Sequence, residues 1–386
     1  MKFLTDHIKG DRVVWVIVLI LSLISIVSVY SSTGSLAFRY QGGNTEYYVL
    51  KHFLTVLTGL FIMYLIHRVK YTYFSRIAQL LFLISVPLLL YTLVKGTNVN
   101  EAARWLTIPF IGISFQSSDL AKLAVILFLA RALALKQDNI NDLKGSFIPV
   151  MWPIFLVTLL IFPANLSTAA LVFGTSLIIM FIGRVPVKFI GGSLLIMVVV
   201  GLMAILIIMQ APGKGRTGTW AKRIESFTSG GVDDEGDYQA LQSKIAIANG
   251  GITGRMPGNS TQRNFLPHPY SDFIYALIVE ELGLIGGIFI LLLYLILLYR
   301  GIRIATRSPG SFGAFLSIGL TILIVFQALI NMGVAVNLLP VTGQPLPLVS
   351  MGGTSIWFTC ISLGIILSVS RSDEEEKATA NENTKA

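Results

Sequence analysis

The sequence carries little charge. Only 13% of its 386 residues are Asp, Glu, Lys or Arg, which is roughly half the share of a typical soluble domain. Apolar runs of about 20 residues recur along the whole chain, and runs of this length match the thickness of a bilayer. The composition therefore excludes an ordinary soluble domain and predicts an all-α polytopic membrane protein.

Cysteine and histidine are also scarce. The single Cys360 lies inside an apolar run, so the chain cannot form an intramolecular disulfide. The four histidines are scattered without metal-ligand spacing, and the sequence leaves open whether a divalent cation, Mg²⁺ or Mn²⁺, assists. The net charge of +9 does not indicate nucleic-acid binding, because the Lys and Arg residues lie in short loops rather than in one patch.

About ten apolar segments are expected to cross the membrane. They are 13–33, 48–66, 77–94, 118–135, 147–163, 166–183, 189–209, 273–299, 312–333 and 354–370. Residues 1–371 then form one transmembrane domain with a long extracytoplasmic loop at 210–272. The polar, acidic tail 372–386 is expected to be disordered.

Two connections have unusual compositions. The loop 334–353 contains too much Pro and Gly for a helix but is apolar, so it is expected to pack against protein as a re-entrant or capping loop. In the 210–272 loop, a helix starting at Asp237 and stopped by Asn249-Gly250-Gly251 is expected to lie on the outer membrane surface. Its apolar stripe would comprise Tyr238, Leu241, Ile245 and Ala248.

The positive charges predict an orientation. If the N-terminus is inside, the short outside loops hold only Arg39, Lys51, Lys95 and Arg104. The inside segments then hold Lys2, Lys9, Arg12, Arg68, Lys70, Arg76, Arg131, Lys136, Lys144, Arg184, Lys188, Arg300, Arg303, Arg307, Arg371, Lys377 and Lys385. The positive-inside rule therefore places both termini in the cytoplasm and the 210–272 loop outside.

A carboxylate marks the point where a Pro-broken loop runs into an apolar segment. Ser271 is a good N-cap, which would place Asp272 in the first helical turn, where the helix dipole favours negative charge. Glu280 and Glu281 follow inside the apolar segment, and acids at such depth usually mark a site. From chemistry alone, Asp272 serves equally well as a general base or as a helix-capping carboxylate.

Four stretches of this chain resemble the SEDS family (shape, elongation, division and sporulation proteins), and they occur in the family's order over nearly the whole length. They are Arg104-Trp105 with Gln116 to Lys122, Trp220 to Phe227, Asn264 to Gly283, and Pro340 to Ser355. Residues 266–273 and the fuller C-terminal motif are more like the family's cell-division member FtsW than its elongation member RodA. The chain departs from the family pattern at Asp119, Asn165, His268 and Met351.

The resemblance implies a peptidoglycan glycosyltransferase that polymerises lipid II on the outer face of the bacterial cytoplasmic membrane, in septal wall synthesis. A class B penicillin-binding protein transpeptidase and other cell-division proteins are the implied partners. Asp272 is the implied general base, and the implied substrate-binding residues are Lys122, Arg104, Arg216, Lys222, Arg223 and Glu280. A lipid II flippase and an elongation-type polymerase remain as alternatives.

Each implied role has a simpler structural reading beside it. Lys122 lies about 6 Å into its span by helical rise, so it could snorkel outward. The loop cations could contact only lipid head groups, and Glu281 could serve only in hydrogen bonds between helices. Lys122 and Asp272 are at similar depth, and we expect them to pair until an incoming diphosphate competes for Lys122.

Overall fold

The computed structural model describes residues 9–40, 42–99, 102–107, 114–210, 235–267 and 269–385. Its α-helices are α2 Arg12–Ser32, α3 Gly34–Tyr40, α4 Thr45–Arg68, α5 Thr72–Lys95, α6 Ser117–Leu135, α7 Ile148–Ile161, α8 Leu166–Ile182, α9 Val187–Gln210, α11 Glu235–Gly250, α12 Ile274–Arg307, α13 Ser311–Ala335 and α14 Thr354–Lys385. The short elements are β1 Thr97–Val99, β2 Ala102–Thr107, β3 Ser114–Gln116, η1 Gln137–Asn139, η2 Leu143–Phe147 and η3 Gln262–Asn264.

Ten of the described helices coincide with the ten predicted apolar segments, which confirms the prediction of an all-α polytopic membrane protein. Seven of the described helical segments are long and apolar enough to cross a membrane. The helix α6 also matches a predicted span, but it carries Asp119, Lys122 and Arg131 along its length. The sequence did not predict the antiparallel sheet β1-β2-β3, which leads directly into α6.

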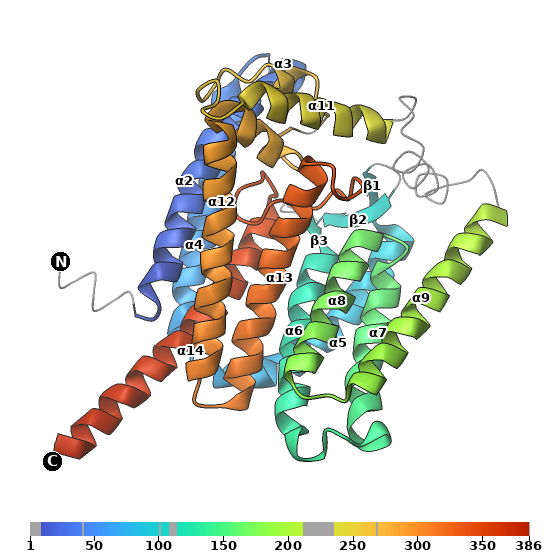
Figure 1. Ribbon diagram of the computed structural model, residues 1–386, viewed down its shortest axis with the longest axis vertical. Coiled ribbons are helices and arrows are strands. Elements are labelled where there is room, and N and C mark those ends of the chain that lie inside the picture. The colour runs from blue at the N-terminus through green and yellow to red at the C-terminus, as the bar shows by residue number, and fades with distance from the viewer. Residues whose placement is uncertain are drawn as a thin grey trace.

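The helices form a bundle, and α11 lies across one end of it (Figure 1). Small residues let neighbouring helices approach closely, as is common in membranes. A Cβ atom added to Gly59 of α4 would lie 2.9 Å from the Cys360 sulfur of α14, and one added to Gly301 of α12 would lie 2.2 Å from the Thr321 hydroxyl of α13. The core of the bundle therefore depends on glycines that are placed opposite larger side chains.

Helix α12 is broken at Gly283, where φ is 69° and ψ is −174°. This backbone region is essentially open only to glycine. The segment after α11 fills the break: Arg255 and Met256 donate their backbone N–H groups to the carbonyls of Glu280 and Glu281, at 3.0 and 2.9 Å. The interruption separates a short helix that follows Asp272 from the long span below it.

The break also explains the length of α12. Its 34 residues would extend about 51 Å as one helix, although the hydrocarbon core is only about 30 Å thick. Residues 284–307 alone extend about 36 Å, which is sufficient to cross. Glu280 and Glu281 lie before the break. They are therefore outside the continuous part of the span, whereas the sequence analysis placed them inside it.

The loop after α13 packs inside the protein, as predicted, over its second half, residues 344–350, whereas Leu338 and Leu339 near its start are exposed. Gln344, Leu346, Val349 and Ser350 are each 3% exposed or less. The Tyr294 hydroxyl of α12 donates to the carbonyl of Pro347 in this loop. This irregular backbone is accommodated inside the bundle because protein groups satisfy it, which is the condition for non-helical chain at membrane depth.

Two segments differ from the sequence-based expectation. The predicted helix at residues 237–248 is present as α11, but its packed face is Ser243, Ala246 and Gly250 rather than the apolar stripe, because these small residues allow close contact with α12 and α13. Tyr238 and Leu241 stay exposed. The tail after Arg371, expected to be disordered, continues α14 to Lys385, in agreement with the high helix propensity of its Ala, Glu and Lys residues.

Replacing Gly283 with alanine should destabilise the protein. The backbone conformation alone would cost about 1–3 kcal/mol, and the new Cβ would also lie 2.2 Å from the Ile252 carbonyl oxygen. We expect a lower midpoint of thermal unfolding in detergent, measured by the loss of the monodisperse elution peak after heating. Gly174→Ala is the matched control, because a Cβ there meets nothing within 4 Å; equal midpoints for the two variants would contradict this reading of the break.

Candidate active site

Asp272 lies in the turn immediately before α12 and is partly buried. Helix α12 begins at Ile274, and no side chain caps it, so the predicted N-cap role of Ser271 is wrong. The Ser271 hydroxyl instead donates to Asp272 Oδ1 at 2.7 Å. Helix α12 begins two residues later than expected, because the loop after α13 holds the backbone of residues 270–272 in place.

The contacts that hold this turn come from α13 and the buried loop. Asn331 of α13 donates from Nδ2 to the carbonyl of Asp272 at 2.8 Å and to the carbonyl of Gln344 at 2.7 Å. The Ser350 hydroxyl donates to the carbonyl of Ser271 at 2.6 Å. Asp272 is therefore presented by a backbone that other elements fix, while its carboxylate stays partly accessible.

Lys122 does not pair with Asp272, so the predicted resting pair is wrong. Its ammonium group lies 2.8 Å from Asp119 Oδ1, one helical turn earlier in α6, and donates to Gln327 Oε1 at 3.0 Å. Lys122 is only 6% exposed, so it does not snorkel to the surface. The i,i+3 spacing within one helix brings Asp119 to Lys122 without any tertiary contact.

Two amide side chains on one face of α13, Gln327 and Asn331, connect Lys122 with the Asp272 turn. Gln327 accepts from Lys122 and donates from Nε2 to the carbonyl of Pro345 at 3.0 Å, and Asn331 lies one turn further along. Asp119 Oδ2 and Asn331 Oδ1 are buried and accept no hydrogen bond within the described part of the chain. The lysine and the aspartate therefore face the same polar layer, joined through α13 and the buried loop rather than by a direct ion pair.

Glu280 and Glu281 are buried and hydrogen-bonded to the loop before the turn. Glu280 accepts from the hydroxyl of Ser260 and from the N–H and hydroxyl of Thr261, at 3.1 and 2.9 Å for the latter two. Glu281 accepts from the Ser31 hydroxyl of α2 and from the N–H of Gly258. Both acids thus anchor the 258–262 segment on α12, and the structural reading of Glu281 agrees with this geometry. The substrate role of Glu280 stays a prediction.

The remaining predicted residues are placed in part or not at all. The backbone of Arg104 lies in β2, beside Trp105, which pairs with Gln116. Arg216, Lys222, Arg223 and His268 lie outside the described residues. Asn165 caps α8 by accepting from the N–H of Thr168 at 3.2 Å, which accounts for an amide at that position. No three His, Cys, Asp or Glu side chains gather within the described segments, and a role for Mg²⁺ or Mn²⁺ stays a prediction.

Comparison with known proteins decides the family. The family model for FtsW, RodA and SpoVE, described as cell cycle protein, matches residues 11–375. The chain belongs to the SEDS family. Stage V sporulation protein E of Bacillus subtilis is 34% identical over 373 residues, covering 95% of this chain and 98% of that protein. A probable peptidoglycan glycosyltransferase FtsW of Trichlorobacter lovleyi is 32% identical and covers 93% of each.

Solved structures show the same SEDS fold. RodA of Thermus thermophilus has a TM-score of 0.67 at 22% identity, with coverage of 94% of this chain and 97% of that one. A chain from a peptidoglycan synthase complex, described as coordinating polymerisation and crosslinking, has a TM-score of 0.68 at 24% identity and covers 94% and 98%. The resemblance inferred from the four sequence stretches is therefore confirmed for family and fold.

Sequence reasoning missed two amides of this SEDS site, Gln327 and Asn331. Both gave a signal, because they are four residues apart in a largely apolar span and so share one helix face. The sequence analysis gave Asp119 as a departure from the family pattern but not as the partner of Lys122. The i,i+3 spacing could have indicated that pair.

The buried Lys122–Asp119 pair should be energetically coupled. Removing one partner leaves an uncompensated buried charge, which typically costs about 3–5 kcal/mol, so Asp119→Leu and Lys122→Met should each lower the thermal midpoint strongly. The double variant should lose clearly less than the sum of the two, as a double-mutant cycle measures. Lys9→Gln, which breaks the exposed Lys9–Glu375 pair at 3.5 Å and keeps the Arg371–Glu375 pair, is the control and should have little effect. Additive losses at positions 119 and 122 would contradict the pair.

Proposed function

We propose that this chain is a peptidoglycan glycosyltransferase that polymerises lipid II into glycan strands, with a role in septal wall synthesis. The observation that carries the proposal is the placement of Asp272, a partly exposed acidic residue before a helix start. Side chains of two other elements hold the backbone of its turn. The names of the FtsW relatives support the same activity. The chain is about as similar to the sporulation protein, at 34% identity, as to the FtsW relative, at 32%. Wall synthesis during sporulation is therefore the alternative to septal wall synthesis.

The proposed reaction joins two lipid-linked sugars. The acceptor hydroxyl oxygen attacks the anomeric carbon of the donor, the bond from that carbon to the diphosphate oxygen breaks, and undecaprenyl diphosphate leaves. Asp272 accepts the proton of the attacking hydroxyl as general base. The Ser271 hydroxyl, which donates to Asp272 Oδ1, leaves the second carboxylate oxygen for the acceptor.

The leaving diphosphate requires positive charge, since cations stabilise phosphate oxygens by charge-assisted hydrogen bonds. In this proposal Lys122 serves that role by exchanging Asp119, its resting partner, for the diphosphate. Arg104, Arg216, Lys222 and Arg223 are proposed to bind the same group from the outer loops. A role for Glu280 in substrate binding would be indirect, through the loop 258–262 that it anchors.

We further propose that both termini lie in the cytoplasm and that Asp272 faces the outside. The support is the uneven distribution of Lys and Arg between the two ends of the bundle. This orientation places the site where lipid II is available for wall synthesis. A class B penicillin-binding protein is the proposed partner, because a glycan strand needs crosslinking and a similar chain was solved in a peptidoglycan synthase complex described as coordinating polymerisation and crosslinking.

Removing the base should abolish polymerisation. Asp272→Asn in the purified chain, supplied with fluorescent lipid II with and without added transpeptidase, should reduce polymer on a gel by about 10²–10⁴-fold, the usual contribution of general base catalysis. Glu46→Gln is the matched control, because Glu46 is an exposed carboxylate in the first turn of α4 at the same end of the bundle. It should keep the wild-type rate.

Polymer formation by Asp272→Asn at the wild-type rate would disprove the base assignment. If the wild-type chain with its partner makes no polymer but moves fluorescent lipid II across vesicle membranes, the flippase alternative would replace the proposed function.

A further inference from the structure

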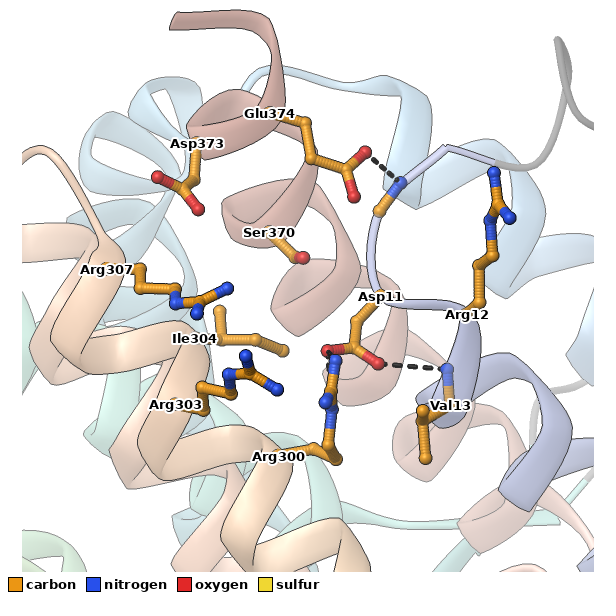
Figure 2. A pocket seen from close by; sticks show the side chains of 11 residues that line it. Asp11, Arg12, Val13, Arg300, Arg303, Ile304, Arg307, Ser370, Asp373 and Glu374 are labelled. Atoms are coloured by element: carbon orange, nitrogen blue, oxygen red, sulfur yellow. Dashed lines mark hydrogen bonds and ion pairs between the residues drawn. The ribbon is translucent and has the colours of Figure 1, made fainter. Parts of the chain in front are cut away.

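A second polar pocket lies at the other end of the bundle from Asp272, where α2 begins and α12 ends. It has a volume of about 390 Å³ and is lined by residues 10–13, by the last turns of α12 and by Ser370, Asp373 and Glu374 of α14 (Figure 2). This volume is in the range of small-molecule sites and exceeds the space that a bare ion needs. The proposed polymerase reaction uses none of its residues.

Part of the pocket wall is held by fixed ionic contacts. Arg300 Nε donates to Asp11 Oδ2 at 2.7 Å, and the Asp11 side chain also caps α2 by accepting from the N–H of Val13 at 2.9 Å. Glu374 accepts from the N–H of Gly10 at 3.0 Å. These contacts join the N-terminal segment to α12 and α14, so the wall exists before any ligand arrives.

Two arginines of α12 in the pocket are not neutralised in this way, and Arg12 of α2, which also lines it, forms no ion pair in the described chain either. Arg303 and Arg307 are four residues apart on α12, and Figure 2 shows both guanidinium groups directed into the space between α12 and α14. Neither guanidinium group lies within 4 Å of a carboxylate in the described chain. The arginines that form ion pairs there are Arg300 and Arg371. Like charges at this spacing repel one another on a helix, and an anion bound between them would remove the repulsion.

We propose that this pocket binds a phosphate-bearing ligand, with Arg303 and Arg307 as its phosphate-binding residues. The planar guanidinium fork matches two phosphate oxygens at once. The hydroxyl of Ser370 lines the same space, and Asp373 and Glu374 border it from α14. Hydroxyl or amine groups attached to the phosphate would meet these acids, which favours a substituted phosphate over inorganic phosphate. The phosphate can come from a lipid head group or from a soluble organophosphate.

Two binding measurements on the full chain, purified in detergent, test the site and distinguish the sources. Isothermal titration with sodium glycerol 3-phosphate, a phosphate that carries hydroxyl groups, reports binding of a soluble organophosphate. Native mass spectrometry after exposure to dioleoylphosphatidylglycerol or dioleoylphosphatidylcholine reports retention of an anionic head group. The test variant is Arg303→Gln/Arg307→Gln. Its control is Arg76→Gln/Lys144→Gln, which removes two exposed positive charges at the same end but outside the pocket.

We expect the pocket variant to weaken glycerol 3-phosphate binding or phosphatidylglycerol retention at least tenfold and the control to match the wild type. Retention of phosphatidylglycerol without glycerol 3-phosphate binding assigns the site to a lipid head group, and the reverse assigns it to a soluble organophosphate. The single variant Arg307→Gln, at an exposed position, should give an intermediate loss of binding. It replaces the double variant as the test if the double variant does not fold. Equal binding by pocket variant and control, or no binding of either probe by the wild type, would overturn the proposal.

Discussion

The structure depends on the hydrogen bonds that two amides of α13 make to an irregular loop. A buried segment without regular secondary structure must find partners for its backbone groups within the protein. Gln327 and Asn331 supply donors to the carbonyls of Pro345 and Gln344. The same two amides reach Lys122 on one side and the backbone of Asp272 on the other. The loop, the lysine and the aspartate therefore form one connected polar layer inside an apolar bundle.

The charged groups of the site pair differently from the sequence-based expectation. Sequence reasoning paired Lys122 with Asp272, which would have tied the lysine to the carboxylate proposed to accept a proton. In the structure Asp119 neutralises the lysine within α6, while Asp272 interacts with the neutral Ser271 hydroxyl. The two charges are thereby kept apart, and each is available for a different part of a substrate. In the proposed reaction, a diphosphate approaching Lys122 would compete with Asp119 and leave the contacts of Asp272 unchanged.

Much of the fold could be predicted because the bilayer imposes a simple length rule on apolar segments. The ten segments and the Pro-rich loop follow from composition, and the helix α11 follows from its local start and stop residues. The break at Gly283 could not be predicted, since a glycine inside an apolar run is compatible with a continuous helix. The anchoring of Glu280 by Ser260 and Thr261 depends on a chain reversal whose register no local pattern specifies. Contacts between residues far apart in sequence, such as Asn331 and Asp272, could not be predicted for the same reason.

The central claim is that α13 positions Asp272 for catalysis, and the polymerisation rate of Asn331→Ala per folded molecule tests it most directly. Alanine removes the donor to the Asp272 carbonyl but leaves the carboxylate in place. Gln344→Ala is the comparison, because it removes a bond from the same loop to Thr168 without touching the Asp272 turn. The account predicts a loss of more than about tenfold for Asn331→Ala, equivalent to about 1.4 kcal/mol, and a rate within about threefold of wild type for Gln344→Ala. A wild-type rate for Asn331→Ala would contradict it.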